Sequence, residues 1–430
     1  MSERNGKAEM PPMGWNSWDC FGGSVTEAEL LAVGAYMQKH LASYGWHYVV
    51  ADAEWYFDSV VYSDAPESVT EGKSGLNMDA FGRLVPSAVR FPSTAGGGSF
   101  RAVADRLHAM GCGFGVHLMR GIPRKAVEAN LPIEGSPFRA ADIADRGSVC
   151  KWCDLCYGVD MSKAGAQAYY DSVIRLCAEW GVDYIKYDDI AGPYYPREIE
   201  AISAAIEKCG RPIVLSLSPG NNASVDTLPH VRAHAEMWRI TGDIWDTWWS
   251  VAHVAGILPA WAPQSRPGCW ADADMLPLGR IGIRTHGKHG PAHMTHLTRD
   301  EQVTLMTLWC IGRSPLIMGG YLPDNDEWTL SLLTNDEVLA VNQQGSRPSE
   351  IVRAAGFSVW TSHLPGGARA VALFNLGDAE QVVSIALSTL GFSGAVGIRD
   401  LWARANVGCG DVALTATLAP HACRLFRVEA

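Results

Sequence analysis

The segment Asp183-Tyr184-Ile185-Lys186-Tyr187-Asp188 decides the fold class of this 430-residue chain. It is a short, β-rich run between two longer stretches of helical character, Lys163–Trp180 and Arg197–Lys208. A strand between helices is typical of βα units, in which helices cover a sheet of parallel strands. The segment therefore predicts an α/β protein.

The same alternation extends in both directions along the chain. Eight short runs are predicted to be strands: Pro12–Trp15, His47–Ala53, Gly113–Leu118, Tyr157–Met161, Asp183–Asp188, Ile213–Ser218, Ala235–Arg239 and Trp270–Leu276. The other predicted helices are Glu27–Leu41, Phe100–Met110, Ile244–Ala255 and Asp300–Ile311, the last of them opened by a capping-box spacing, Thr298 to Glu301. Eight parallel strands alternating with helices predict a (β/α)8 TIM barrel, whose functional side chains gather at the carboxyl ends of the strands.

The pattern changes after Asn342. Gln343–Pro348 is polar and rich in turn residues. The predicted strands that follow are Ile351–Ala354, Phe357–Ser362, Ala368–Phe374, Val382–Ile385, Val396–Asp400, Val412–Leu418 and Ala422–Val428. We expect a barrel over residues 1–342 and a C-terminal antiparallel β-sandwich domain over residues 343–430.

Charge and composition exclude several classes of protein. The net charge is -11, from 35 basic and 46 acidic residues with no basic run, which predicts neither a nucleic-acid nor a membrane partner. The apolar stretch Val303–Gly319 is interrupted by Arg313 and Pro315, so no membrane span is expected. Eleven cysteines cannot all pair, and Met1–Glu9 lacks the apolar segment of a secretory signal; together these favour a cytoplasmic location unless a signal has been removed. The oligomeric state stays open.

Acidic side chains follow two predicted strands at the end where a barrel holds its site. Lys186 and Asp188 share one strand face because side chains alternate, and the lysine favours an ionised carboxylate. Asp243 lies in the turn that follows Arg239. Two carboxylates from neighbouring strand ends are what hydrolysis of an acetal requires. A helix cap and a structural ion pair would account for the same residues, so the spacing alone leaves both interpretations open.

Four motifs carry a resemblance to a known family. They are Pro-Pro-Met-Gly-Trp-Asn-Ser-Trp at residues 11–18, Lys186-Tyr187-Asp188, the loop from Arg239 to Asp243, and Asp-Ala-Asp-Met-Leu at residues 272–276. In this order they resemble glycoside hydrolase family 27, which comprises α-galactosidases, α-N-acetylgalactosaminidases and their relatives. The resemblance covers nearly the whole chain. It implies a retaining exo-α-glycosidase that hydrolyses terminal α-D-galactosyl residues of an oligosaccharide or glycoside, without a metal or organic cofactor.

The resemblance also implies roles for individual residues. Asp188 matches the nucleophile of the family, and Asp243 matches its acid/base. The residues expected to bind the sugar are Trp18, Asp52, Glu54, Trp55, His117, Lys186 and Arg239. We expect Trp18, Trp55 and the aromatic loop Trp245–Trp249 to close a pocket for one terminal sugar, since aromatic faces stack on the C–H faces of sugars.

The chain departs from the family pattern where specificity is set. Typical galactosidases carry Asp-Asp-Cys-Trp where this chain reads Asp52-Ala53-Glu54-Trp55, so Ala53 replaces the second acid of a pair that binds the far hydroxyls of the sugar. Glu54 is expected to share the strand face of Asp52 and to compensate. Ser216–Pro219 also departs, and His117 stands where a tyrosine is common. Alternative substrates are therefore a β-L-arabinopyranoside (galactose without its hydroxymethyl group), an α-N-acetylgalactosaminide or an α-glucoside; a sugar-binding protein without catalysis is a more remote alternative.

Two further patterns suggest metal binding but have simpler explanations. Cys150, Cys153 and Cys156 form C-x2-C-x2-C without a fourth ligand at suitable spacing. The histidines His286, His289, His293 and His296 lie in a loop that contains Gly and Pro, just before a helix. We expect a loop of free thiols near the pocket and a solvated histidine loop, and no metal site.

Overall fold

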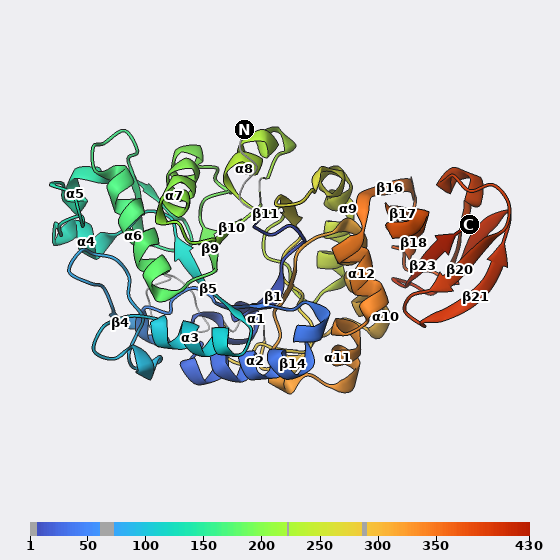
Figure 1. The fold of residues 1–430 in the computed structure, drawn as a ribbon, viewed down its shortest axis with the longest axis horizontal. Coiled ribbons are helices and arrows are strands. Elements are labelled where there is room, and N and C mark those ends of the chain that lie inside the picture. Colours follow the sequence, from blue (N-terminus) through green and yellow to red (C-terminus); the bar gives the residue numbers. More distant parts are fainter. Residues whose placement is uncertain (1–6, 61–72, 222, 286–289) are drawn as a thin grey trace.

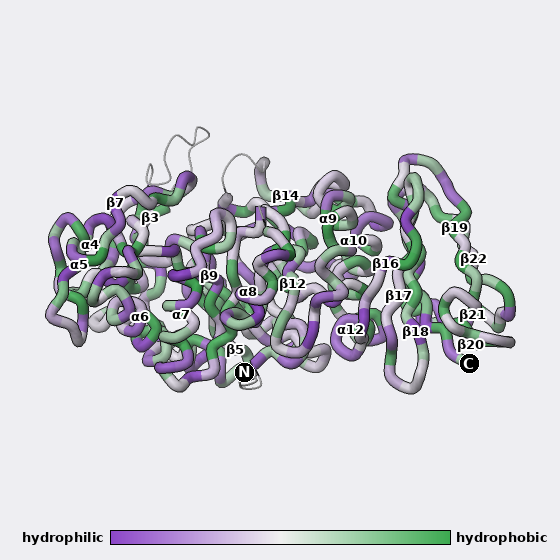
Figure 2. The backbone as a smooth tube through the Cα atoms, turned by 90° about the horizontal axis from the view of Figure 1, so that it is seen from above, coloured by the Kyte–Doolittle hydropathy of each residue, from purple (hydrophilic) through white to green (hydrophobic). Residues whose placement is uncertain are grey.

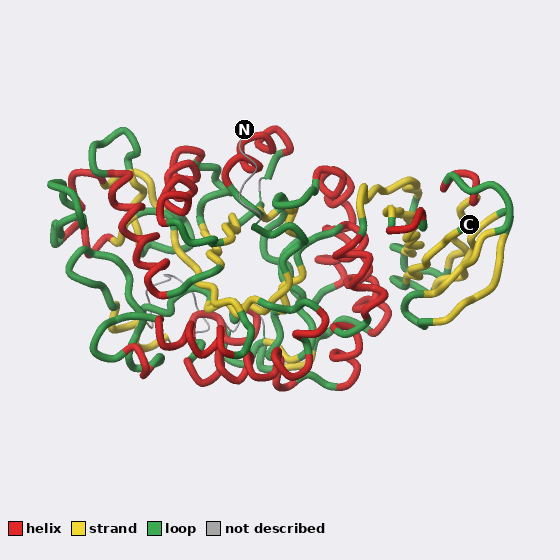
Figure 3. The backbone as a smooth tube through the Cα atoms, viewed as in Figure 1, coloured by secondary structure: helices red, strands yellow, loops and turns green. Residues whose placement is uncertain are grey.

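A closed barrel of eight parallel strands forms the centre of the molecule (Figure 3). The structure is a computed structural model that describes residues 7–60, 73–221, 223–285 and 290–430. In sheet order the strands are β12 (Trp270–Asp272), β11 (Met237–Arg239), β10 (Val214–Leu217), β9 (Tyr184–Asp188), β5 (Gly113–Met119), β2 (Tyr48–Ala51), β1 (Met13–Asn16) and β15 (Leu316–Met318). The ring closes where Leu276 N donates to Ile317 O at 2.7 Å and Gly319 N donates to Leu276 O at 2.9 Å.

Helices surround the strands as an outer layer (Figure 1). The longer ones are α2 (Glu27–His40), α3 (Arg101–Ala109), α6 (Ala166–Trp180), α7 (Pro196–Cys209), α8 (Leu228–His234), α9 (Trp248–Trp261), α10 (Arg299–Gly312), α11 (Glu327–Leu333) and α12 (Asp336–Gln344). Short helices are α1 (Trp18–Phe21), α4 (Arg124–Glu128) and α5 (Ala140–Ile143). All six predicted helices are present, and one apolar face of each packs on the barrel. Among the described residues, no helix is both long and apolar enough to span a bilayer.

One of the eight predicted barrel strands is wrong. Tyr157–Met161 overlaps β8 (Cys156–Val159), which pairs antiparallel with β6 (Ile122–Pro123) and β7 (Ala144–Val149) in a separate small sheet. The eighth barrel strand is instead β15, which follows α10 at the end of the apolar stretch Val303–Gly319. A buried strand of three apolar residues shows no alternation, so its sequence cannot be told from the end of a buried helix.

The C-terminal residues form two antiparallel sheets. The larger contains, in order, β16 (Ser346–Ala354), β17 (Phe357–His363), β18 (Arg369–Asn375), β23 (Cys423–Glu429), β20 (Val396–Asp400) and β21 (Ala405–Gly410). The smaller pairs β19 (Gln381–Ala386) with β22 (Ala413–Leu418), which lie farther from the barrel than β16 and β17 (Figure 2). An apolar core that includes Val371, Leu373 and Val383 fills the space between them, as in a β-sandwich. Each predicted strand of this domain is present; the sequence does not predict β21, an exposed edge strand that contains two glycines.

The β-sandwich packs firmly on α10. Trp402 Nε1 donates to Thr307 Oγ1 at 2.8 Å, and Thr304 Oγ1 donates to His421 O at 2.6 Å. Residues of β17, β18 and β23 belong to the same continuous apolar cluster as the barrel. The expected domain boundary after residue 342 falls in the last turn of α12, shortly before β16 begins.

Candidate active site

A pocket opens at the carboxyl ends of the barrel strands. Its lining comprises Trp18, Asp52, Ala53, His117, Trp152, Lys186, Asp188, Pro219, Asn221 and Asp243. The two carboxylates that the sequence singled out, Asp188 and Asp243, therefore face one cavity. Asp188 ends β9, and Asp243 lies in the loop between β11 and α9.

The two carboxylates differ in exposure and in partners. The side chain of Asp188 is 11% exposed, and that of Asp243 is 54% exposed. Asp188 Oδ2 lies 2.9 Å from Nε2 of the fully buried His117, and its Oδ1 accepts a hydrogen bond from Asp189 N at 2.8 Å. Burial alone would raise the pKa of Asp188, but the hydrogen bond from His117 and the charge of Lys186 outweigh it and hold the pKa below its usual value. Asp188 is thus an ionised carboxylate at neutral pH.

Lys186 and Asp52 form a buried ion pair on the floor of the pocket. Lys186 Nζ donates to Asp52 Oδ2 at 2.9 Å, and Asn16 Nδ2 donates to the same oxygen at 2.6 Å. Burial raises the pKa of Asp52, but Lys186 and His117 outweigh this effect and lower it to about 2. Burial lowers the pKa of Lys186, and Asp52 and Asp188 more than compensate and raise it above its usual value. The pair therefore presents a fixed cation and a fixed anion to a bound polyol.

Arg239 lies beneath the pocket and holds the loop of Asp243. Its Nη2 donates to Asp243 Oδ1 at 3.2 Å, and its Nη1 lies 2.6 Å from Asp274 Oδ1. Asp274 also accepts a hydrogen bond from Ile244 N at 2.8 Å. Burial raises the pKa of Asp274 to about 7, although Arg239 counteracts this effect. Asp274 belongs to the Asp-Ala-Asp motif, but the sequence did not indicate that it anchors this loop.

Glu54 and Trp55 do not line the pocket, contrary to the sequence-based expectation. Glu54 has a φ of +73° and forms an ion pair with Lys73, and a Cβ on Gly23 would clash with its carboxylate. Strand alternation fails for Glu54 because β2 ends at Ala51 and a turn follows. Glu54 therefore does not replace the second acid of the pair, and Ala53 lines the pocket while Glu54 does not.

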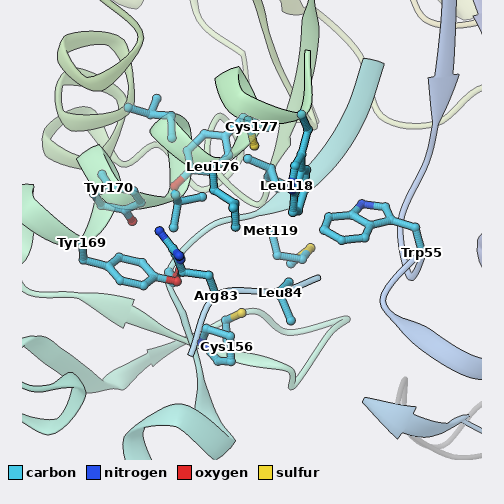
Figure 4. A pocket seen from close by; sticks show the side chains of 16 residues that line it. Trp55, Arg83, Leu84, Leu118, Met119, Cys156, Tyr169, Tyr170, Leu176 and Cys177 are labelled. Carbon is cyan, nitrogen blue, oxygen red and sulfur yellow. The ribbon is translucent and has the colours of Figure 1, made fainter. Parts of the chain in front are cut away.

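Trp55 lies behind the barrel wall. It is fully buried, and its Nε1 donates to His117 O at 2.8 Å. Together with Leu118, Met119 and Leu176 it lines a separate apolar cavity between the strands and α6 (Figure 4). Trp55 thus supports the backbone of His117 instead of contacting a sugar.

The aromatic loop Trp245–Trp249 is not part of the pocket lining either. Trp248 stacks on His421 of the β-sandwich, with ring centroids 3.9 Å apart. Trp249 is 71% exposed and stacks on His253. The pocket instead receives Trp152, from the cysteine-containing loop, together with Pro219 and Asn221. The sequence offered one signal for Trp152 as a pocket residue, because it lies between Cys150 and Cys153 in the loop expected near the pocket.

The cysteines carry free thiols. All eleven lie within the described residues and none is bonded to another. Cys150, Cys153 and Cys156 are buried, and burial raises the pKa of each thiol, which disfavours the thiolate that binds metals. His286 and His289 lie outside the described residues. In the part of the chain that the structure describes, one group of three side chains has the spacing of a metal site, Asp246, His293 and His296.

Comparisons with known proteins agree with this architecture. The family model described as "Alpha galactosidase A" matches residues 134–344, and the model of the "Alpha galactosidase C-terminal beta sandwich domain" matches residues 354–428. Alpha-galactosidase 2 of Arabidopsis thaliana is 28% identical over 99% of this chain and 91% of its own length.

Among solved structures, a β-L-arabinopyranosidase of family 27 from Geobacillus stearothermophilus is 47% identical over 98% of this chain and 97% of its own, with a TM-score of 0.95. A single-residue variant of that enzyme, in complex with arabinose, matches equally well, with a TM-score of 0.95. Full-length similarity at this identity, together with both domain matches and the barrel-end pocket, places the chain in one family. The chain belongs to glycoside hydrolase family 27 and is a glycoside hydrolase.

Proposed function

We propose that this glycoside hydrolase removes a terminal β-L-arabinopyranosyl residue by a retaining double displacement. The observation that carries the proposal is that Ala53 lines the pocket, where the galactosidase pattern has a second acid. β-L-arabinopyranose is galactose without its hydroxymethyl group. A methyl group can neither donate to nor accept from a hydroxymethyl oxygen, and Glu54 is turned away. The similarity to an arabinopyranosidase supports the same substrate.

The remaining polar groups suit the part of the ring that galactose and arabinopyranose share. Asp52 accepts hydrogen bonds from Lys186 and Asn16 and keeps its charge, so it can accept a further bond from a sugar hydroxyl. Lys186 has three N–H donors and uses one of them for Asp52. The indole of Trp18 provides an apolar wall on which C–H groups of the ring can stack.

In the first displacement, Asp188 attacks the anomeric carbon while Asp243 donates its proton to the glycosidic oxygen. The carbon–oxygen bond to the aglycone breaks, and a covalent glycosyl ester forms on Asp188. In the second, Asp243 takes a proton from water, the water oxygen attacks the anomeric carbon, and the ester bond to Asp188 breaks. Two inversions return the original configuration.

The environments of the two carboxyl groups support this division of roles. The lowered pKa of Asp188 keeps the nucleophile ionised. Asp243 is the more exposed of the two and lies on a loop, where an aglycone and then a water molecule can reach it. Arg239 and Asp274 hold that loop from below, so the acid is positioned without being buried.

An α-galactosidase is the second candidate. Curated relatives that are 26–28% identical over most of this chain are named α-galactosidases. The mechanism would be the same, but the hydroxymethyl group of galactose would lack an acidic partner at residue 53. An enzyme whose pocket hydrogen-bonds a substrate hydroxyl strongly rejects a substrate that lacks that hydroxyl. Without an acid at residue 53, this enzyme would have no such preference for galactose over arabinopyranose.

Initial rates on a panel of aryl glycosides test the proposal: β-L-arabinopyranoside, α-galactoside, α-N-acetylgalactosaminide and α-glucoside. We expect kcat/KM for the arabinopyranoside to exceed that for the galactoside by about tenfold or more. The reason is that the hydroxymethyl oxygen of the galactoside would be bound without a hydrogen-bond partner, which costs roughly 1–3 kcal/mol. A53D should shift the ratio towards the galactoside. A53V, which adds volume without an acid, is the matched control and should not. A dominant galactoside rate in the unchanged enzyme would favour the second candidate, and no turnover on any of the four would contradict both.

A further inference from the structure

Outside the pocket, two histidine side chains converge on one carboxylate oxygen from another part of the chain. Asp246 lies in the loop of the acid/base, three positions after Asp243, while His293 belongs to β14 (His293–Met294) and His296 follows it. Asp246 Oδ2 lies 3.0 Å from His293 Nε2 and 3.0 Å from His296 Nδ1. Their ligand atoms all lie within 4.8 Å of one another. We refer to these residues as the Asp246 cluster.

The hydrogen bonds of His293 require a cation in this cluster. Its Nδ1 lies 2.7 Å from Pro291 O, and because a carbonyl oxygen can only accept, Nδ1 must carry the hydrogen. In a neutral imidazole Nε2 then has a lone pair, which points at the carboxylate of Asp246. Two acceptors 3.0 Å apart repel each other unless a proton or a metal ion lies between them.

The second histidine supplies another nitrogen that a metal ion, unlike a single proton, would use. The rings of His293 and His296 stack with centroids 4.0 Å apart and an angle of 15° between their planes. A proton on His293 would satisfy only its own contact with Asp246, whereas one ion can take a nitrogen from both rings once the exposed His296 rotates out of the stack. The hydrogen bond to Pro291 O has the form of the outer contact that fixes the tautomer of a metal-binding histidine.

We propose that the Asp246 cluster binds one divalent transition-metal ion of the zinc type. Two imidazole nitrogens and one carboxylate oxygen form a donor set that zinc takes in sites that keep a position open. Ligands about 2.1 Å from a tetrahedral ion are about 3.4 Å apart, so both 3.0 Å contacts of Asp246 Oδ2 would lengthen by a few tenths of an ångström when the ion binds. His293 and Asp246 are largely buried, and the side chain of His296 is 69% exposed, which leaves one side of the ion open to water.

The ion would join two segments that meet near the pocket. One is the loop from Asp243 to Asp246, and the other is the hairpin of β13 (Arg280–Ile281) and β14. His296 N already donates to Asp246 Oδ2 at 2.7 Å, so the backbone of the second segment lies within reach. The role is structural: the ion would restrict the loop that carries the proposed acid/base, without touching the sugar.

Zinc binding to the whole, untagged chain tests the proposal. The protein is treated with a chelator, dialysed, and titrated with zinc chloride by isothermal titration calorimetry. We expect one zinc ion per chain and a higher Tm in its presence. H296A and H293A should each weaken zinc binding by more than about 100-fold. Removing a residue that only hydrogen-bonds to a metal ligand costs up to about 100-fold in affinity, and removing a ligand itself should cost more. H296A is the safer variant, because its exposed side chain contributes little to packing.

Two controls separate the cluster from other zinc ligands. H253A removes a histidine of the neighbouring α9 that lies outside the cluster and should bind zinc normally. The double variant C150S/C153S should also keep its affinity, and cobalt bound in place of zinc should show no thiolate charge-transfer band. Unsaturable zinc binding, an affinity unchanged in H296A and H293A, or a cobalt–thiolate band would overturn the proposal. Because the readout is metal binding and not turnover, its failure is distinct from failure of the proposed substrate.

Discussion

Asp188 is kept ionised by a neighbour that the sequence did not link to it. Strand alternation put Lys186 beside Asp188, but Lys186 bonds directly to Asp52, and it is His117 on the adjacent strand β5 that contacts Asp188. The parallel register pairs Met119 with Asp188 and His117 with Lys186, which brings the imidazole next to the carboxylate. Which side chains meet across two strands depends on the register of the pairing, and the sequence of one strand does not determine that register.

Replacing this imidazole should move the acid limb of the pH–rate profile. In H117F, Asp188 loses the hydrogen bond that lowers its pKa, so that pKa rises. The nucleophile must be ionised, and activity falls as the pH drops through its pKa; the loss should therefore begin at a higher pH in H117F than in the unchanged enzyme. The pH dependence of kcat/KM measures this.

A matched pair elsewhere in the barrel provides the control. His108 Nε2 lies 2.6 Å from Asp183 Oδ2, at the start of β9 and away from the pocket. H108F should leave the acid limb in place. An unmoved limb in H117F would contradict the role assigned to His117.

The two carboxylates can be told apart by their dependence on the leaving group. D188N should abolish turnover on every substrate, since no glycosyl ester can form. D243N should slow an alkyl glycoside by roughly 10²–10⁴-fold but a dinitrophenyl glycoside much less, because a good leaving group needs no proton. Steady-state kinetics on both substrates gives the comparison. Equal losses in D243N on the two substrates would argue against its role as the acid, and circular dichroism checks that each variant is folded.

At the scale of elements, the capping box predicted at the start of α10 is confirmed. Thr298 Oγ1 accepts from Glu301 N at 3.3 Å, and Glu301 Oε2 accepts from Thr298 N at 2.8 Å. A cap is set by residues three positions apart, so the sequence contains all of it. The strand β15 that follows the same helix could not be identified, because its assignment depends on pairing with β1, which lies about 300 residues earlier in the chain.

Removing this cap should reduce stability without affecting catalysis. T298A loses the side-chain oxygen that satisfies a free backbone N–H, at a cost of about 1 kcal/mol in the free energy of unfolding. T298S keeps the oxygen and is the control. Chemical denaturation followed by circular dichroism measures the difference, and kcat should stay unchanged because Thr298 does not line the pocket. A loss of the same size in T298S would show that the methyl group, and not the cap, matters.

At the scale of the whole molecule, barrel and β-sandwich share one apolar core. Buried residues of β17, β18 and β23, among them Trp360, Phe374 and Leu425, belong to the same cluster as the barrel helices. Arg399 of the sandwich pairs with both carboxylate oxygens of Glu337 on α12, at 2.6 Å each. α10 is buried over most of its length because it lies between the two bodies.

We therefore expect the chain to unfold in a single transition. W402A removes a partly buried indole that packs at this interface and donates to Thr307. It should lower the free energy of unfolding by up to about 3 kcal/mol, the lower end of the cost for a buried aromatic, while the transition stays single. V412A, at an exposed position of the sandwich, should change it by less than about 0.5 kcal/mol. Differential scanning calorimetry distinguishes the outcomes, and an early separate transition for the sandwich would show that the two parts are not coupled.

The sequence by itself determined the features that depend on neighbouring residues. These are the period of the helices, the cap at Thr298, the change of pattern after Asn342, and the two acidic residues at strand ends. Only the tertiary structure decided which side chains share the pocket. Ala53 faces the pocket while Glu54 turns towards Lys73, because the backbone leaves strand geometry after β2, and Trp55 ends behind the wall for the same reason. The Asp246 cluster brings together residues about 50 positions apart in the sequence, and only the fold of the intervening chain places them around one oxygen atom.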